Sequence, residues 1–213
     1  MKYLEVKRDL ESIKNLKTKD VDLYDKKLIK EKADVSDLKE YAIKDQLVHR
    51  TYFQVSLAEL KTYQEKFEFI EDNFDFLQDW WHVDQLMQFL RKKPIDFNYA
   101  YNKAKEYIKN DNPFVRRWGY VLFLMDFQKN PKYAPYILKL FKDDDAYYVE
   151  MGEAWLLADM AIFSFDQVYN FLLSSGLKYN ILGKAIQKMC DSFRISDEHK
   201  EQVKAIRDKI RDN

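Results

Sequence analysis

The sequence predicts an all-α protein, and three observations carry that prediction. The chain of 213 residues holds only 4 glycines and 4 prolines, fewer turn-forming residues than an all-β protein needs. Hydrophobic residues make up 46% of the chain, with 15 Phe and 15 Tyr, so a sizeable core can form and disorder is not expected. Apolar residues recur along most of the chain at the spacing of one helix face.

The helical segments can be placed in order from their apolar positions and their end signals. Residues 4–16 and 23–29 predict two charged helices at the N-terminus. Ser36 is expected to cap a helix over 37–52. Pro113, preceded by asparagine, predicts a helix with proline in its first turn. The other predicted helices cover 57–73, 76–93, 97–110, 114–128, 133–142, 146–162, 164–175, 180–193 and 196–210.

The second half of the chain is internally periodic. The segments "FVRRWGYVLFLMDF" and "YVEMGEAWLLADMA" align with Val115 against Val149, and Ile181 continues the series at a period of roughly 33 residues. A shorter predicted helix lies between each aligned pair. Since one helix pair cannot bury its own apolar face, the pairs are expected to stack into a HEAT-like α-solenoid with a concave groove. A non-repeating helical bundle is the alternative.

These patterns predict a single HEAT-like repeat domain over residues 1–213. Within it, residues 1–35 form divergent charged helices, and residues 36–213 form the stacked helix pairs. We expect a monomer.

Charge and cysteine content limit the classes of partner and compartment. The 36 basic and 36 acidic side chains give no net charge, whereas a nucleic-acid-binding protein usually carries a basic excess. The single cysteine, Cys190, is expected to be a small buried hydrophobe, and one cysteine fits a reducing compartment. The start of the chain is charged and no run of 18 apolar residues occurs, so we expect a cytoplasmic protein with no membrane partner.

The segment "DWWHVDQ" holds the first candidate site. Trp80 and Asp84 stand four residues apart, so they share one edge of a helix, beside its apolar side. The alternative is a helix whose tryptophan is half core and whose aspartate makes an ion pair. His82 is a lone histidine with no metal-spaced partner, since His49 and His199 lie in distant charged helices, so neither a metal site nor a cofactor is expected.

Two arginines and the last of the four tryptophans form the second candidate site. Arg116 and Arg117 stand near the start of a repeat helix, as a phosphate clamp or as a solvated start paired with an acid such as Asp111. Trp155 lies on the next repeat helix, so it is expected to face the same groove as Arg117.

Three segments together resemble the AlkD-like DNA alkylation repair family, the HEAT-like repeat DNA glycosylases. "DWWHVD" resembles the family's Trp-x-x-x-Asp helix at Trp80 and Asp84. "NPFVRRWGYVLFL" resembles its arginine-bearing repeat at Arg117, and "YYVEMGEAWLLADM" resembles its tryptophan repeat at Trp155. The order and intervals agree from about Phe53 to Ile195.

The resemblance implies excision of positively charged N3- and N7-alkylpurines from DNA. It implies that Trp80 and Trp155 pack against the deoxyribose of the lesion, without a base-flipping pocket. It implies that Asp84 stabilises the oxocarbenium-like sugar and positions the attacking water, because a carboxylate favours a developing positive charge. Arg117 and Arg116 would bind DNA.

The departures from the family pattern predict a short branch with a weaker hold on DNA. Ala158 stands where the family has an arginine, and Met125 stands where it has a lysine. No glycine precedes Gly119, so the family's N-terminal DNA-binding helical segment is expected to be missing or replaced by the charged region Lys2–Lys32.

Three hypotheses follow. The favoured one is a scaffold of this superfamily that binds DNA weakly or not at all and excises little, with another protein or ligand in its groove. The second is an active alkylpurine DNA glycosylase acting through Asp84 with Trp80 and Trp155, with DNA contacts from Arg116 or from the "RKK" of residues 91–93. The third is an unrelated helical-repeat adaptor.

Overall fold

The computed structural model describes residues 2–91 and 94–211, and among these residues it contains helices and no strand. The predicted all-α fold of repeated helix pairs is therefore confirmed. The chain divides into two compact units, residues 1–94 (unit 1) and 95–213 (unit 2), and each is described by itself. The expectation of one domain over 1–213 stays a prediction.

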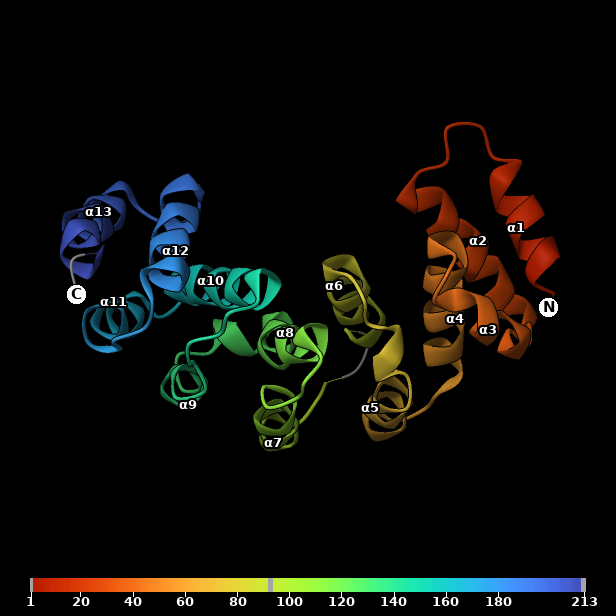
Figure 1. The fold of residues 1–213 in the computed structure, drawn as a ribbon, viewed down its shortest axis with the longest axis horizontal. Helices are drawn as coiled ribbons and strands as arrows, with labels where there is room; N and C mark the ends of the chain where they lie inside the picture. The colour runs from red at the N-terminus through yellow and green to blue at the C-terminus, as the bar shows by residue number, and fades with distance from the viewer. Residues whose placement is uncertain (1, 92–93, 212–213) are drawn as a thin grey trace. The chain divides into compact units, whose positions relative to one another are not determined.

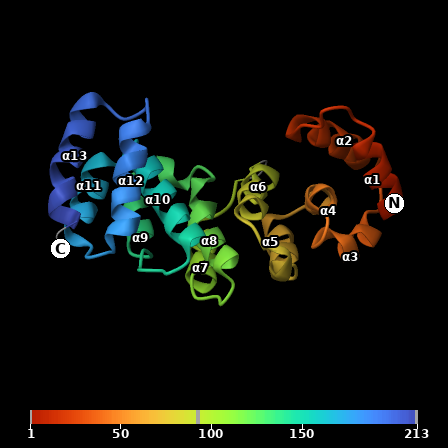
Figure 2. The same ribbon diagram turned by 45° about the horizontal axis from the view of Figure 1, so that its top comes forward.

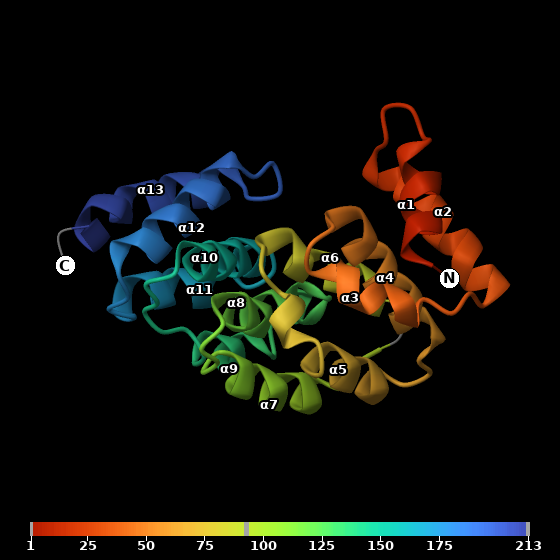
Figure 3. The ribbon, with the colours of Figure 1, turned by 45° about the vertical axis from the view of Figure 1, so that its right-hand side comes forward.

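Unit 1 is built around its fourth helix. Its elements are α1 (Tyr3–Glu11), α2 (Thr18–Glu31), η1 (Ser36–Leu38), α3 (Lys39–Ala42), α4 (Gln46–Glu59), α5 (Tyr63–Glu71), η2 (Phe74–Phe76) and α6 (Trp80–Leu90). Helices α1, α2, α3 and α6 all contact α4, and α1 lies beside α2 (Figures 1 and 3). Because neighbours cover α4 on several sides, it buries apolar side chains such as Val48, Phe53 and Leu57 completely.

The predicted helix over 37–52 is wrong, because it breaks into separate elements. Ser36 begins the short 3-10 helix η1 and makes no side-chain cap. The chain then turns after Ala42, and a new helix, α4, begins at Gln46. Asp45 caps α4, since its carboxylate accepts from the backbone N–H of Leu47 at 3.1 Å. Apolar periodicity continues across this break and does not reveal it.

Local caps also move the next two predicted helices. The segment 57–73, predicted as one helix, contains the end of α4 and then a separate helix, α5. Helix α5 begins at Tyr63 after a capping box formed by Thr62 and Glu65. The helix predicted over 76–93 begins later, at Trp80, because the Asp79 carboxylate accepts from the Trp80 N–H at 2.7 Å. Lys92 and Lys93 lie outside the described residues.

Unit 2 stacks helix pairs as the periodicity predicts. Its elements are α7 (Phe97–Tyr107), α8 (Pro113–Val121), η3 (Leu122–Leu124), η4 (Phe127–Lys129), α9 (Ala134–Leu138), α10 (Tyr147–Ala161), α11 (Phe165–Ser174), α12 (Tyr179–Asp191) and α13 (Asp197–Arg211). The aligned helices pack in sequence, with α10 between α8 and α12 (Figure 2). The aligned residues Val115, Val149 and Ile181 are all fully buried.

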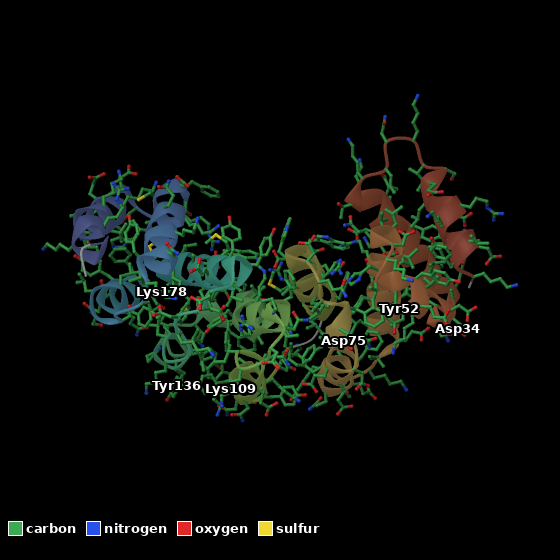
Figure 4. All side chains as sticks on the ribbon, viewed as in Figure 1. Asp34, Tyr52, Asp75, Lys109, Tyr136 and Lys178 are labelled. Carbon is green, nitrogen blue, oxygen red and sulfur yellow. The ribbon has the colours of Figure 1, made fainter. Side chains whose placement is uncertain are left out.

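A second layer of helices supports the stack of α8, α10 and α12. Helix α7 packs on α8. Helix α11 packs on both α9 and α10, and α13 packs on α11 and α12. Lys109 and Tyr136 lie on the α7–α9 side of unit 2, where their side chains point outward (Figure 4). Since α10 is covered on several sides, most of its residues are buried, including Glu153.

The start of α8 and its packing against α7 each depend on a particular residue type. Asn112 caps it and Pro113 occupies its first turn, as predicted. A Cβ at Gly119 would lie 2.7 Å from the Ile108 side chain, so only glycine lets α8 approach the end of α7 this closely. The helix ends at Val121, earlier than predicted, and Asp126 adopts a left-handed φ of 83° between the 3-10 turns η3 and η4.

Within the described ranges, none of the helices combines the length and the apolar character that a membrane crossing requires.

Candidate functional site

Trp80 and Asp84 line the same cavity, which lies wholly within unit 1. It has a volume of about 510 Å³ and lies between the start of α2, the first turns of α4 and the exposed edge of α6. Trp80 is 45% exposed, which is high for a tryptophan, and Asp84 is half-buried. The lining residues are Leu16, Lys17, Thr18, Val21, Gln46, Leu47, Arg50, Trp80, Trp81, Asp84, Gln85 and Gln88. The predicted pair therefore borders a space that can hold a ligand.

Arg50 joins the three helices around this cavity. Its Nη2 donates to the Asp22 carboxylate of α2 at 2.5 Å, so the two charges balance each other. Its Nη1 faces Oε1 of Gln85 and its Nη2 faces Oε1 of Gln88, both on α6 and both at 3.4 Å. The guanidinium also lies over the Phe89 ring, 5.3 Å from its centre. This one side chain, 8% exposed, connects α2, α4 and α6.

A buried aromatic cluster adjoins the cavity through Trp81. The rings of His49 and His82 stack with their centres 3.7 Å apart, and Trp81 packs edge-on against both. His49 Nδ1 donates to the Ala42 carbonyl at 3.1 Å, whereas His82 Nδ1 accepts from the Gln78 N–H at the same distance. Burial, together with the neighbouring His82, lowers the pKa of His49 to about 3. Burial also lowers the pKa of His82. Both rings are therefore neutral near pH 7.

A fully buried acid, Asp25, links α2 to α4. Asp25 is fully buried, and the hydroxyl of Thr51 donates to its carboxylate at 2.7 Å. Burial raises the pKa of Asp25 to about 7 although the hydrogen bond from Thr51 and the charge of Arg50 oppose the shift. The contact faces of α2 and α4 are thus partly polar.

The two predicted DNA-binding arginines make internal contacts in unit 2. Arg117 is 4% exposed, and its Nη1 donates to the backbone carbonyl of Tyr148 at 2.7 Å. Its side chain also packs against Gly152 of α10, where a Cβ would lie 3.3 Å from two of its atoms. The guanidinium therefore connects α8 to the start of α10.

Arg116 is bound on both sides of its guanidinium. It donates to both oxygens of the Asp144 carboxylate, at 2.7 and 3.0 Å, and to the carbonyls of Asn110 and Asp111, both at 2.9 Å. The hydrogen bond to Asp144 raises the pKa of the Arg116 guanidinium. This resembles the predicted helix start paired with nearby acids, although the carboxylate comes from Asp144 and Asp111 contributes only its backbone.

Trp155 lines a second, smaller cavity, within unit 2. This cavity has a volume of about 330 Å³, and Trp155 is half-buried in its wall. Asp159, four residues further along α10, accepts from Nε2 of Gln128 at 2.8 Å and from Nη1 of Arg194 at 3.3 Å. The other lining residues are Ala158, Ile162, Lys188, Asp191 and Ser192.

The predicted site residues thus form two groups. Trp80 and Asp84 come together in unit 1, whereas Arg116, Arg117 and Trp155 belong to unit 2. That the two groups share one concave groove stays a prediction, as do their catalytic and DNA-binding roles. Sequence reasoning missed Arg50, Gln85 and Lys17, because their place in the cavity depends on contacts between helices far apart in the chain.

Among residues 2–91 and 94–211, no group of three or more His, Cys, Asp or Glu is placed to hold a metal ion.

Comparison with known proteins gives one match. The family model described as DNA alkylation repair enzyme matches residues 12–189, which is most of the chain and includes both groups of predicted site residues. No curated protein and no solved structure matches the chain.

Proposed function

This chain belongs to the DNA alkylation repair enzyme family, and we propose that within it the chain keeps a site for a cationic purine while it holds duplex DNA weakly or not at all. Base excision is correspondingly weak or absent. In this proposal the chain acts mainly as a binding scaffold of the superfamily.

The single observation that carries the proposal is the commitment of both arginines to internal contacts. Arg117 is 4% exposed, and Arg116 donates to a carboxylate and to two backbone carbonyls. A phosphate would have to break these contacts, whereas a free guanidinium would gain about 1.5–3 kcal/mol from a charge-assisted bond. Met125 and Ala158, which replace two cations of the family, are apolar and buried. Because the chain carries no net charge, few counterions would be released from DNA on binding, and the affinity for DNA that such release supplies is small.

The cavity of unit 1 supports the purine site. Trp80 offers an exposed indole face, and Asp84 lies one helical turn further along the same edge. An aromatic face together with a carboxylate suits a flat ligand that carries a positive charge. A purine alkylated at N7 or N3 is such a ligand.

A titration of the whole protein with labelled duplex DNA at 150 mM salt tests the weak hold. We expect a Kd of about 10⁻⁴ M or weaker, the weak end of non-specific binding. The Arg116→Gln variant should bind DNA as the wild type does, provided circular dichroism shows that it folds. A Kd near 10⁻⁸ M, or a loss of binding in Arg116→Gln, would contradict the proposal.

An active glycosylase is the second candidate, favoured by the exposure of Trp80 beside Asp84. In it, Asp84 stabilises the developing sugar cation, with Trp80 and Trp155 against the deoxyribose. The test measures release of 7-methylguanine from duplex DNA by the wild type, by Asp84→Asn and by Asp197→Asn. Asp197 is a matched control because its side chain is fully exposed in unit 2. Release abolished only by Asp84→Asn establishes the enzyme, and no release by the wild type excludes it.

A further inference from the structure

The outer helices of unit 2 carry an excess of lysine, although the chain as a whole is neutral. Residues 97–142 hold seven lysines against three acidic residues, in addition to the two internally bound arginines. Lys105 on α7 is exposed, and so are Lys132 and Lys139 at the two ends of α9. Within the described part of the chain, no carboxylate pairs with any of these three lysines. Their ammonium groups are therefore available to an anionic partner.

An aromatic cluster joins α7 to α9 on this side of unit 2. The rings of Phe97 on α7 and Tyr133 at the start of α9 stack face to face, with their centres 3.9 Å apart. Tyr101 and Tyr136 meet edge to face, with their centres 6.4 Å apart. Tyr136 is 49% exposed, and its side chain points outward, as does that of Lys109 (Figure 4). An exposed tyrosine held by neighbouring rings is a firm surface on which a flat group can stack.

The three lysines border this cluster from both helices. Lys105 lies one helical turn beyond Tyr101, and its Nζ is 5.3 Å from the centre of that ring. Lys132 and Lys139 flank Tyr136 in the sequence, four residues before it and three residues after it. Positive charge therefore lies beside the exposed ring on α7 and on α9.

The acidic run that follows α9 has partners elsewhere. The Asp144 carboxylate binds Arg116 of α8. Asp145 binds Nζ of Lys178, and Asp143 accepts from the backbone N–H of the same lysine. None of these contacts involves a lysine of α7 or α9, so the acidic run does not occupy the cations beside the aromatic cluster.

We propose that this surface, the α7–α9 face, binds single-stranded DNA; we define the face by Tyr101, Lys105, Lys132, Tyr136 and Lys139. A base of the strand stacks on Tyr136, and the lysines bind the phosphates on either side of it. A duplex keeps its base faces inside its own stack, so the lysines alone can hold it. The inference goes beyond the proposed function, since it concerns other helices and unpaired DNA. The choice of DNA over RNA rests on the family to which the chain belongs.

The aromatic and basic composition of the α7–α9 face favours a nucleic acid over an anionic membrane. A helix that lies on a membrane buries exposed aliphatic or aromatic side chains in the lipid, beside its lysines. On α9 the aliphatic residues Ile137 and Leu138 are buried in unit 2, and the large apolar side chain left outside is that of Tyr136. One exposed ring suits stacking on a base better than insertion into lipid.

Fluorescence anisotropy of the whole protein with a labelled oligodeoxythymidylate of about 12 nucleotides tests the proposal. At 150 mM salt we expect a Kd of about 10⁻⁵ M, roughly tenfold tighter than for duplex DNA, because a base can stack on Tyr136. The logarithm of the association constant should fall with the logarithm of salt concentration with a slope of about −2, since each of three lysines contributes about −0.7. Equal affinity for the duplex, no binding at about 10⁻⁴ M protein, or tighter binding of oligouridylate would overturn the proposal.

Tyrosine variants assign the stacking to the α7–α9 face. Tyr136→Leu keeps an apolar side chain and removes the ring, so the affinity for the single strand should fall about tenfold. Tyr136→Phe keeps the ring and should bind as the wild type does. Tyr147→Leu, at a tyrosine of α10 that is 56% exposed, is the matched control and should also bind as the wild type does. Wild-type affinity in Tyr136→Leu, or a loss in Tyr147→Leu alone, would exclude the α7–α9 face.

Lysine variants assign the phosphate contacts. The double variant Lys132→Gln, Lys139→Gln should reduce the salt slope from about −2 to about −0.7. The double variant Lys204→Gln, Lys209→Gln, at exposed positions on α13, removes the same charge and should keep the wild-type slope. Vesicles of phosphatidylcholine and phosphatidylserine should not bind. Vesicle binding that Lys132→Gln, Lys139→Gln abolishes would make the face a membrane surface and overturn the proposal.

The duplex titration separates this inference from the proposed function. Weak duplex binding with no single-strand binding refutes the inference alone. Duplex binding with a Kd near 10⁻⁸ M, together with still tighter single-strand binding that Tyr136→Leu weakens, refutes the weak hold on duplex DNA and leaves the α7–α9 face assigned.

Discussion

Helices α6 and α10 each carry a tryptophan four residues ahead of an aspartate, Trp80 with Asp84 in unit 1 and Trp155 with Asp159 in unit 2. Each pair lines a cavity of its own unit. The surroundings differ. The carboxylate of Asp159 is bound by Gln128 and Arg194, which attach it to neighbouring parts of unit 2. Beside Asp84, the side chain that joins neighbouring helices is instead Arg50, which donates to Asp22 on α2 and faces Gln85 on α6. Identical spacing thus occurs in two different polar surroundings, with the aspartate itself bound by Gln128 and Arg194 in unit 2 and a neighbouring arginine joining the helices in unit 1.

Burial also shifts the pKa values of titratable groups on the two helices in opposite directions, downward on α6 and upward on α10. On α6, His82 stacks on His49, and burial keeps both rings neutral. On α10, Glu153 is fully buried, close to the Tyr120 side chain and the Lys142 backbone. Burial raises the pKa of Glu153 to about 8. Acid should therefore destabilise the stacked pair His49 and His82, and alkali should destabilise the surroundings of Glu153.

The largest expected effect is on α10, through Glu153→Gln. Folded Glu153 keeps its proton up to pH about 8, whereas the unfolded chain loses it near the ordinary glutamate value of 4.5. The folded state therefore holds the extra proton between these values, and stability falls as pH rises through the window. The variant should remove about 2–4 kcal/mol of this loss between pH 4.5 and 8.5. Hydrogen exchange of peptides from α10 measures it.

An exposed glutamate on α7 gives the control for this measurement. Glu106→Gln should leave the pH dependence of exchange in α10 as it is in the wild type. If Glu153→Gln leaves that dependence unchanged as well, Glu153 is ionised in the folded protein, and the contrast between the units fails.

The next effect is on unit 1, through His49→Phe, which keeps an aromatic ring in the stack. Folded His49 stays neutral down to pH about 3, whereas the unfolded chain takes up the proton near 6.5. Stability is therefore lost as pH falls through this window. Asp25, with its pKa raised to about 7, acts in the opposite direction, so only the difference between variant and wild type isolates His49. We expect the variant to lose about 2 kcal/mol less than the wild type between pH 7 and 4. Exchange in α4 reports it, and parallel profiles would contradict the assignment.

A smaller effect separates the two aspartates by ligand affinity. Asp84→Asn should weaken 7-methylguanosine binding about tenfold, or about 1.4 kcal/mol, because an amide carries no charge and accepts at only one atom. Asp159→Asn should leave the affinity unchanged and instead lower the stability of unit 2 by about 1 kcal/mol, since Gln128 and Arg194 lose a charged partner. Calorimetry and urea unfolding measure the two. Equal losses of affinity would erase the distinction between the pairs.

The smallest effect is on stability, in Trp80→Ala. A tryptophan that is 45% exposed contributes little to the core, so we expect a loss below about 1 kcal/mol. Trp118, which is fully buried, is the matched control and should lose about 3–5 kcal/mol on substitution by alanine. A large loss in Trp80→Ala would make it a packing residue and would restore the alternative reading of this helix.

Sequence patterns predict what is local or periodic in this chain. The stacking of α8, α10 and α12 follows from their repeated apolar positions, and the start of α8 follows from Asn112 and Pro113. The shared edge of Trp80 and Asp84 follows from helix geometry alone. The family match confirms the resemblance that these segments carry.

The rest depends on contacts that the sequence order does not encode. The burial of Arg117 comes from a carbonyl 31 positions away, and Arg50 reaches the cavity through partners on α2 and α6. The break at Asp45 is a competition between a side-chain cap and the continuing helix, which apolar spacing cannot resolve.

The link from Arg50 to Asp22 has a practical consequence for anyone who shortens this chain. Residues 1–35 look dispensable beside the regular repeats. Yet Asp22 of α2 supplies the counter-charge of Arg50. Four residues that line the cavity, Leu16, Lys17, Thr18 and Val21, also lie at or just before the start of α2. A truncation after residue 35 would strand a guanidinium beside Gln85 and open the compartment to water. A crystal structure of such a fragment would then describe a protein without the intact cavity of unit 1.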